Sequence, residues 1–107
     1  MSPEQTYPEF VQSLPQADIP MQGPQAYLLT GGPCQVVFFE LPAGSSVPPH
    51  SHGAQWGIIV EGELEFTIGG KKRVCRRGDT YYIPAGVEHS VEVSALCRAI
   101  DFFAQPD

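Results

Sequence analysis

Short segments of alternating polar and apolar residues, separated by glycine and proline turns, restrict the possible folds of this chain more than any other feature. The 107 residues include eleven glycines and eleven prolines, and no stretch shows the period of an amphipathic helix. The clearest segment is 63–68, where Leu64, Phe66 and Ile68 alternate with polar residues. Such short strands with turn signals between them predict an all-β fold, an antiparallel barrel or jelly roll.

The chain divides into a predicted N-terminal arm, residues 1–25, and a barrel domain, residues 26–107. Five prolines in the arm are too closely spaced for a helix of any length. Apolar anchors in the arm suggest that it lies extended on the barrel or on a partner subunit: Tyr7, Phe10, Leu14 and Ile19. Because the arm and the open edge of a small barrel both need covering, we expect a homodimer.

Composition excludes several classes of protein. A net charge of −6 disfavours a nucleic-acid partner, because phosphate binding depends on a basic surface. The basic residues gather at 71–77 after the turn signal Gly69-Gly70, which is typical of a charged edge strand, with an anion-binding patch as the alternative. The sequence contains neither a signal peptide nor an apolar run long enough for a membrane span, so we expect a soluble cytoplasmic protein without a membrane partner. Cys34, Cys75 and Cys97 are expected to be buried free thiols.

All the histidines of the chain fall into one pattern that indicates a metal site. His50 and His52 form an extended His-x-His, which places both rings on one face of a strand. His89 follows the rigid bend Pro84-Ala85-Gly86. Neutral imidazole is the commonest protein ligand for a first-row metal, and three imidazoles leave positions open for water or substrate. A hydrogen-bonded core histidine is the alternative for any one of them.

These spacings resemble the two conserved motifs of the cupin family over about residues 34–103. The residues at the positions of the first motif are Gly44, His50, His52, Gln55 and Gly62, and those at the positions of the second are Gly78, Pro84, Gly86, His89 and Val93. Gln55 stands where cupins usually have glutamate, and Val93 where they usually have asparagine. The resemblance implies a double-stranded β-helix with a divalent transition metal (zinc, manganese, iron, nickel or copper) bound by His50, His52, His89 and Gln55. Gln55 could instead hydrogen-bond a metal-bound water.

The replacement of glutamate by Gln55 predicts the charge of the ligand. Three neutral imidazoles and a neutral amide leave both positive charges of a divalent ion uncompensated. In a cavity of low dielectric constant this favours an anionic ligand such as a carboxylate, or a bidentate oxygen donor.

Asp101 is the candidate catalytic residue. It is the carboxylate of an otherwise apolar final strand, and inside the barrel its pKa would be raised toward the range of a general acid or base. An outward position, or a pairing with Arg98, is equally compatible with the sequence. The Asp-x-Phe ending, Asp101 to Phe103, is similar to that of small cupins that open the ring of unsaturated uronates on a site of three histidines and one glutamine.

Aromatic residues are expected to wall the substrate pocket, with Trp56, Tyr82 and Phe103 as candidates and Tyr81 as a further one. Since neighbours on a strand face opposite ways, at least one of the two tyrosines is expected to pack in the core. The favoured function is a metal-dependent isomerase or lyase acting on a carboxylate-bearing sugar derivative. An iron-dependent dioxygenase and a non-enzymatic domain that binds a small ligand through the metal remain alternatives.

Overall fold

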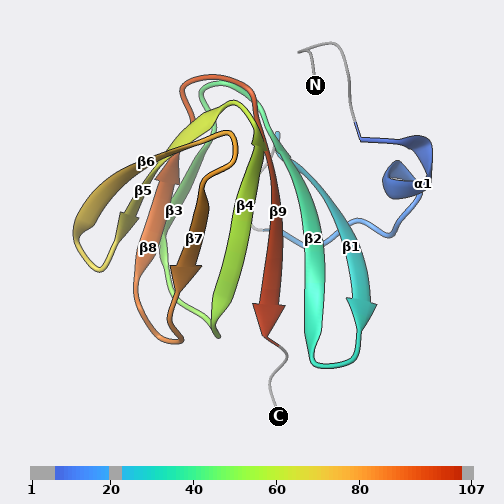
Figure 1. The fold of residues 1–107 in the computed structure, drawn as a ribbon, viewed down its shortest axis with the longest axis horizontal. Helices are drawn as coiled ribbons and strands as arrows, with labels where there is room; N and C mark the ends of the chain where they lie inside the picture. The colour runs from blue at the N-terminus through green and yellow to red at the C-terminus, as the bar shows by residue number, and fades with distance from the viewer. Residues whose placement is uncertain (1–6, 20–22, 105–107) are drawn as a thin grey trace.

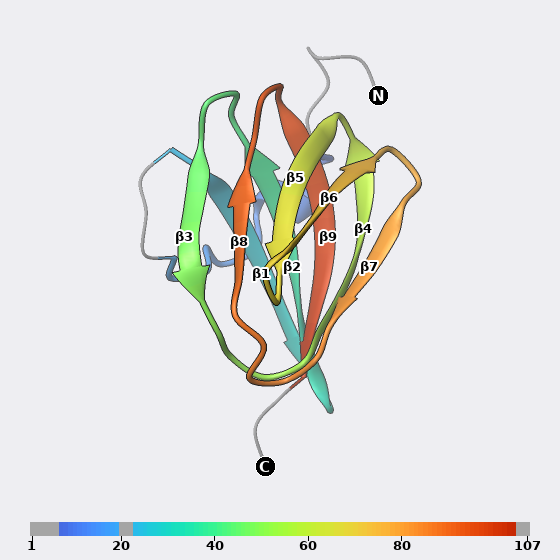
Figure 2. The same cartoon turned by 90° about the vertical axis from the view of Figure 1, so that its left-hand side faces the viewer.

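The chain folds into two antiparallel sheets that face each other, as a computed structural model covering residues 7–19 and 23–104 shows (Figures 1 and 2). One sheet contains five strands in the order β1-β2-β9-β4-β7, and the other contains four in the order β3-β8-β5-β6. The strands are β1 (Gln25–Gly31), β2 (Cys34–Leu41), β3 (Ser46–His50), β4 (Gln55–Glu61), β5 (Glu63–Ile68), β6 (Lys71–Arg76), β7 (Thr80–Ile83), β8 (His89–Glu92) and β9 (Cys97–Ala104). The predicted all-β jelly roll is confirmed.

The core lies between the sheets and follows the predicted alternation. On β5, Leu64 and Phe66 are buried and Ile68 is half-buried against them. The turn from β5 to β6 is made by Gly69 and Gly70, both at positive φ, as a two-residue hairpin between strands of right-handed twist requires. β6 forms the edge of its sheet and carries most of the basic cluster, so the charged-edge interpretation of residues 71–77 fits the topology.

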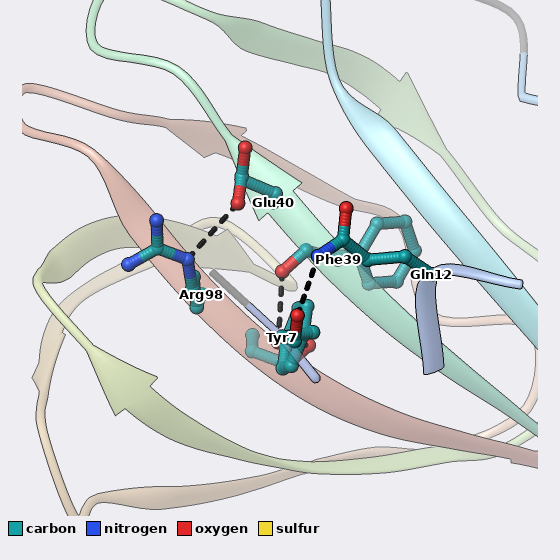
Figure 3. Close-up of polar contacts among 6 residues, drawn as sticks. Tyr7, Gln12, Phe39, Glu40 and Arg98 are labelled. Carbon is teal, nitrogen blue, oxygen red and sulfur yellow. Dashed lines mark hydrogen bonds and ion pairs between the residues drawn. The ribbon is translucent and has the colours of Figure 1, made fainter. Parts of the chain in front are cut away.

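The N-terminal segment packs on the outer face of the five-stranded sheet through Tyr7 (Figure 3). The buried Tyr7 hydroxyl lies 3.0 Å from the Phe39 carbonyl oxygen and 3.1 Å from that of Ala99, so it can donate to either strand. Its ring and that of Phe38 pack in a T-shaped arrangement with centroids 5.6 Å apart. These contacts tie a segment far from the barrel in sequence to two of its central strands.

A one-turn helix, α1 (Glu9–Gln12), corrects the expectation of a fully extended arm. Residues 9–14 are free of proline, and the Pro8 carbonyl accepts the first bonds of the turn, from the amides of Val11 and Gln12. Val11 is buried, whereas the predicted anchor Phe10 is 78% exposed. Beyond the helix the segment extends along β1, where Gln16 pairs with Tyr27. None of the helices among the described residues is long and apolar enough to cross a membrane.

Candidate metal centre

The three histidines converge at one end of the barrel. His50 ends β3 and pairs with His89 at the start of β8, so adjacent strands present the two rings side by side with centroids 4.2 Å apart. His52 lies in the connection after β3 and not on the strand itself, because β3 ends at His50. Its carbonyl accepts the amide of Gly86 at 2.9 Å, which joins the two loops that carry the histidines. Its ring centroid lies 4.7 Å from that of His89.

Backbone carbonyls orient all three rings in the same way. Nδ1 of His50 lies 2.8 Å from the Pro48 carbonyl, Nδ1 of His52 lies 2.8 Å from that of Gly53, and Nδ1 of His89 lies 3.0 Å from that of Val87. A carbonyl only accepts, so each neutral ring carries its proton on Nδ1 and keeps the lone pair of Nε2 free. Such a second hydrogen bond is how proteins fix a metal-binding histidine.

The chemistry of the donor set fits a metal ion. Ligand atoms of the three histidines all lie within 4.8 Å of one another. Nε2 of His89 is buried and has no hydrogen-bond partner, and the same is true of Oε1 of Gln55. Unpaired buried polar atoms are rare because each costs desolvation free energy, and a cation between them would satisfy both. Burial also lowers the pKa of His89, which keeps the ring neutral and able to bind metal.

Gln55 and Asp101 share the inner face of the five-stranded sheet. Gln55 is buried at the start of β4, and it hydrogen-bonds the carboxylate of Asp101 on β9. The amide can therefore donate to Asp101 through its nitrogen while its oxygen has no hydrogen-bond partner. Of the two arrangements compatible with the sequence, the inward one is observed: Asp101 is 4% exposed, whereas Arg98 pairs with Glu40 on the outer face at 3.0 Å (Figure 3).

Tyr81 and Gly57 complete the surroundings of Asp101. Gly57 on β4 lies between Asp101 on β9 and Tyr81 on β7, and the Tyr81 hydroxyl donates to the carboxylate across the glycine. A Cβ on Gly57 would overlap the Asp101 carboxylate and lie 2.5 Å from the Tyr81 hydroxyl. Burial raises the pKa of Asp101 to about 7, against the lowering effect of the bonds from Tyr81 and Gln55. The buried carboxyl group therefore keeps its proton to a higher pH than an exposed aspartate does.

Two of the predicted pocket aromatics lie outside the cavity, and the assignment of Trp56 and Tyr82 is corrected. Trp56 is 41% exposed and Tyr82 is 59% exposed, on the outer face of the sheet. Their neighbours Gln55 and Tyr81 face inward. Because side chains alternate between the two faces along a strand, Trp56 and Tyr82 face outward. Phe103 does line the cavity, with its ring centroid 5.3 Å from that of His52. The signal that selects Tyr81 over Tyr82 is the register in which Tyr81 pairs with Gly57.

A cavity of about 520 Å³ opens from the histidines into the barrel. His50, His52, His89, Gln55, Tyr81, Asp101 and Phe103 all contribute to its wall. This volume lies within the range of about 300–1,000 Å³ that is usual for small-molecule sites. The arrangement can hold a metal, admit a small ligand and place a titrating carboxyl group beside it.

The cysteines take no part in this site. All three thiols are free, with Cys75 and Cys97 buried and Cys34 half-buried. Burial raises the pKa of Cys97 to about 12 and raises that of Cys75 as well, so both remain protonated at neutral pH. The expected structural role of buried thiols holds for these two, whereas Cys34 is only partly covered.

The chain belongs to the cupin family: the model of the cupin domain matches residues 37–102, more than half of the sequence. The barrel resembles KdgF from Halomonas sp., with a TM-score of 0.76 and 25% identity over 90% of both chains. It also resembles an RmlC-like cupin from Shewanella frigidimarina, with a TM-score of 0.75 and 23% identity over 95% of this chain and 93% of that one.

Two longer proteins match this chain over part of their length. Salicylate 1,2-dioxygenase from Pseudoaminobacter salicylatoxidans, in a structure of its adducts with gentisate, gives a TM-score of 0.72 at 20% identity over 83% of this chain and 27% of that one. A mannose-1-phosphate guanylyltransferase from Salmonella montevideo is 39% identical over 49 residues. That match spans 46% of this chain and only 10% of the relative, so it compares one segment of a much larger protein.

Proposed function

We propose that this cupin is a metal-dependent enzyme that moves a proton on a small carboxylate ligand, as an isomerase or a lyase does. The observation that carries the proposal is the connection between two chemical groups. Gln55 lines the same cavity as the histidines, its buried oxygen has no hydrogen-bond partner, and its side chain hydrogen-bonds Asp101. A candidate metal ligand and a candidate acid–base group are thus joined by one side chain.

The site contains residues for metal binding and a residue for proton transfer. His50, His52, His89 and Gln55 would hold a divalent transition metal, which would polarise a carbonyl or carboxylate oxygen of the ligand. Asp101, whose pKa is raised by burial, would take a proton from the carbon next to that carbonyl or carboxylate group and return it elsewhere. The buried position of Asp101 sets the pKa of its carboxyl group, and the hydrogen bond from the Tyr81 hydroxyl orients that group.

The charge of the site supports an anionic ligand. All four proposed protein ligands are neutral, so the charge of the ion is left for the ligand to compensate. The similarity of the sequence to uronate-opening cupins favours a carboxylate-bearing sugar derivative, but the site's charge supports only the carboxylate part of that molecule.

Proton exchange tests the proposal directly. The protein would be loaded with zinc, manganese or iron in D₂O and incubated with a panel of uronates and 2-oxo acids. We expect the NMR signal of the proton on the carbon next to the carbonyl group to disappear as deuterium replaces it. Asp101→Asn should keep the metal and slow exchange at least about a hundredfold, the usual minimum for a general acid–base group. A lack of exchange across the panel, with tight binding retained, would favour the non-enzymatic binding domain.

An iron-dependent dioxygenase is the second candidate, and three histidine ligands with open positions favour it. A similar barrel occurs in salicylate 1,2-dioxygenase, so this fold is compatible with dioxygenase chemistry. Oxygen uptake by the iron-loaded protein in the presence of an aromatic or diketone substrate would select this candidate over the first.

We also infer that the chain pairs with a second copy through the outer face of the five-stranded sheet. Directly paired positions there form one apolar row across all five strands: Leu29, Val36, Phe102, Trp56 and Tyr82. Phe102 is 38% exposed, and the rings of Trp56 and Phe102 lie 5.7 Å apart. The row itself carries no charge, so pairing through it would bring no like charges into direct contact.

A further inference from the structure

The polar side chains that the strands contribute to the cavity wall are confined to the end that holds the histidines. On the inner face of the five-stranded sheet, the row nearest the histidines contains Gln55 and Gln35, and the next contains Asp101 and Tyr81. In the row beyond these, Phe39 pairs with Ala99, and both line the cavity. The wall of this sheet therefore changes from polar to apolar within three successive rows of inward-facing residues.

The facing sheet continues this apolar wall. The side chains that line it are Val47, Leu64, Phe66 and Val91, of which the last three are buried. On this wall a ligand hydroxyl would find no side-chain hydrogen-bond partner and would lose its bonds to water. An aliphatic or aromatic body would instead gain contact with the wall and release the water.

Charge restricts the ligand further. None of the cavity-lining residues in the described part of the chain is a lysine or an arginine. Two carboxylates do line it, Asp101 inside and the exposed Asp18 at its edge. A second negative charge on the ligand, away from the metal, would meet no cation and would be repelled by Asp18.

We infer that the ligand is a monoanionic 2-oxo or 2-hydroxy acid with an apolar body, and not a polyhydroxylated sugar acid or a dianion. This inference rests on the proposed function for the head of the molecule, the carboxylate and its neighbouring oxygen. For the body it rests on the wall of the cavity. Sites with an apolar lining and a few polar groups at one end commonly fix a ligand by its head and select it by its body.

A set of three acids with the same head tests the inference by calorimetry on the zinc-loaded protein. The acids are 2-hydroxy-4-phenylbutanoate, gluconate and 2-hydroxyglutarate. The first should bind at least about tenfold more tightly than the second, since even one buried methylene group can change affinity by that factor. The dianionic third acid should bind more weakly than the first.

Matched variants test the role of the wall. Val91→Thr, which replaces a methyl group by a hydroxyl inside the cavity, should reduce the preference for the phenyl acid several-fold. Val74→Thr, the same change at an exposed position on β6, should leave it unaltered. If Val91→Thr fails to fold, Val47→Thr on the paired position of β3 provides the same test.

The outcomes separate the two claims. Binding of gluconate or 2-hydroxyglutarate as tightly as the phenyl acid would overturn the inference and leave the proposed function intact. Equal binding of the acids to the zinc-loaded and the metal-stripped protein would overturn the proposed function, and with it the inferred head. Failure of all three acids to bind would overturn the inference.

Discussion

The pH dependence of stability should reveal the buried carboxyl group of Asp101. Its pKa rises from 3.8 to about 7 on folding, a difference of roughly 3 units, equivalent to about 4 kcal/mol. Between these pH values the folded protein keeps the proton and the unfolded chain loses it. Raising the pH therefore favours unfolding: the contribution is most favourable below pH 4, falls up to about pH 7 and is constant above. Roughly 2–3 kcal/mol of the loss should fall between pH 5 and pH 8.

Urea unfolding of the metal-stripped protein, compared with Asp101→Asn at each pH, measures this effect. Other titrating groups contribute equally to both proteins, so the difference between the two curves isolates Asp101. Removal of the metal is necessary because a nearby cation would favour the carboxylate. Tyr81→Phe offers a second check: it deletes a hydrogen bond that lowers the pKa, so the decline should extend to higher pH. A flat difference curve, or one of opposite sign, would refute the assignment of Asp101 as a carboxyl group destabilised by burial.

Two further predictions concern packing and assembly. Gly57→Ala should displace Asp101 or Tyr81 and lower the free energy of unfolding by about 1–3 kcal/mol, the usual cost of overpacking. The control Gly31→Ala, which has open space around its Cβ, should cost much less. Equal effects of the two changes would contradict the packing described for Gly57. Phe102→Lys should give a monomer of 11.7 kDa by light scattering at a concentration where the natural chain is a dimer, and a natural chain that is itself monomeric at micromolar concentration would refute the interface.

Periodicity and turn chemistry made most of the fold predictable. The alternation through Leu64 and Phe66 identified their buried face, and the Gly69-Gly70 pair identified a hairpin, because both signals depend only on local geometry. The convergence of the histidines was predictable because their spacing follows a known motif.

Contacts between distant strands were not predictable in the same way. Tyr81 and Tyr82 are chemically similar neighbours, and only the pairing of Tyr81 with Gly57 decides which one meets Asp101. Arg98 is almost completely buried although it lies on the outer face of its sheet, where it pairs with Glu40 from a strand distant in sequence. The position of α1 likewise depends on how Tyr7 packs, and the proline spacing carries no information on that.

Metal content is the most direct test of the central claim, that the three histidines and Gln55 form a metal centre. The protein purified without chelators should contain close to one equivalent of a divalent transition metal per chain by elemental analysis. His52→Ala should lose most of it, and Gln55→Ala should lose less because an amide oxygen is the weaker ligand. Protein that carries no metal and takes up none on dialysis against zinc or manganese, or a His52→Ala variant that retains a full equivalent, would contradict the account.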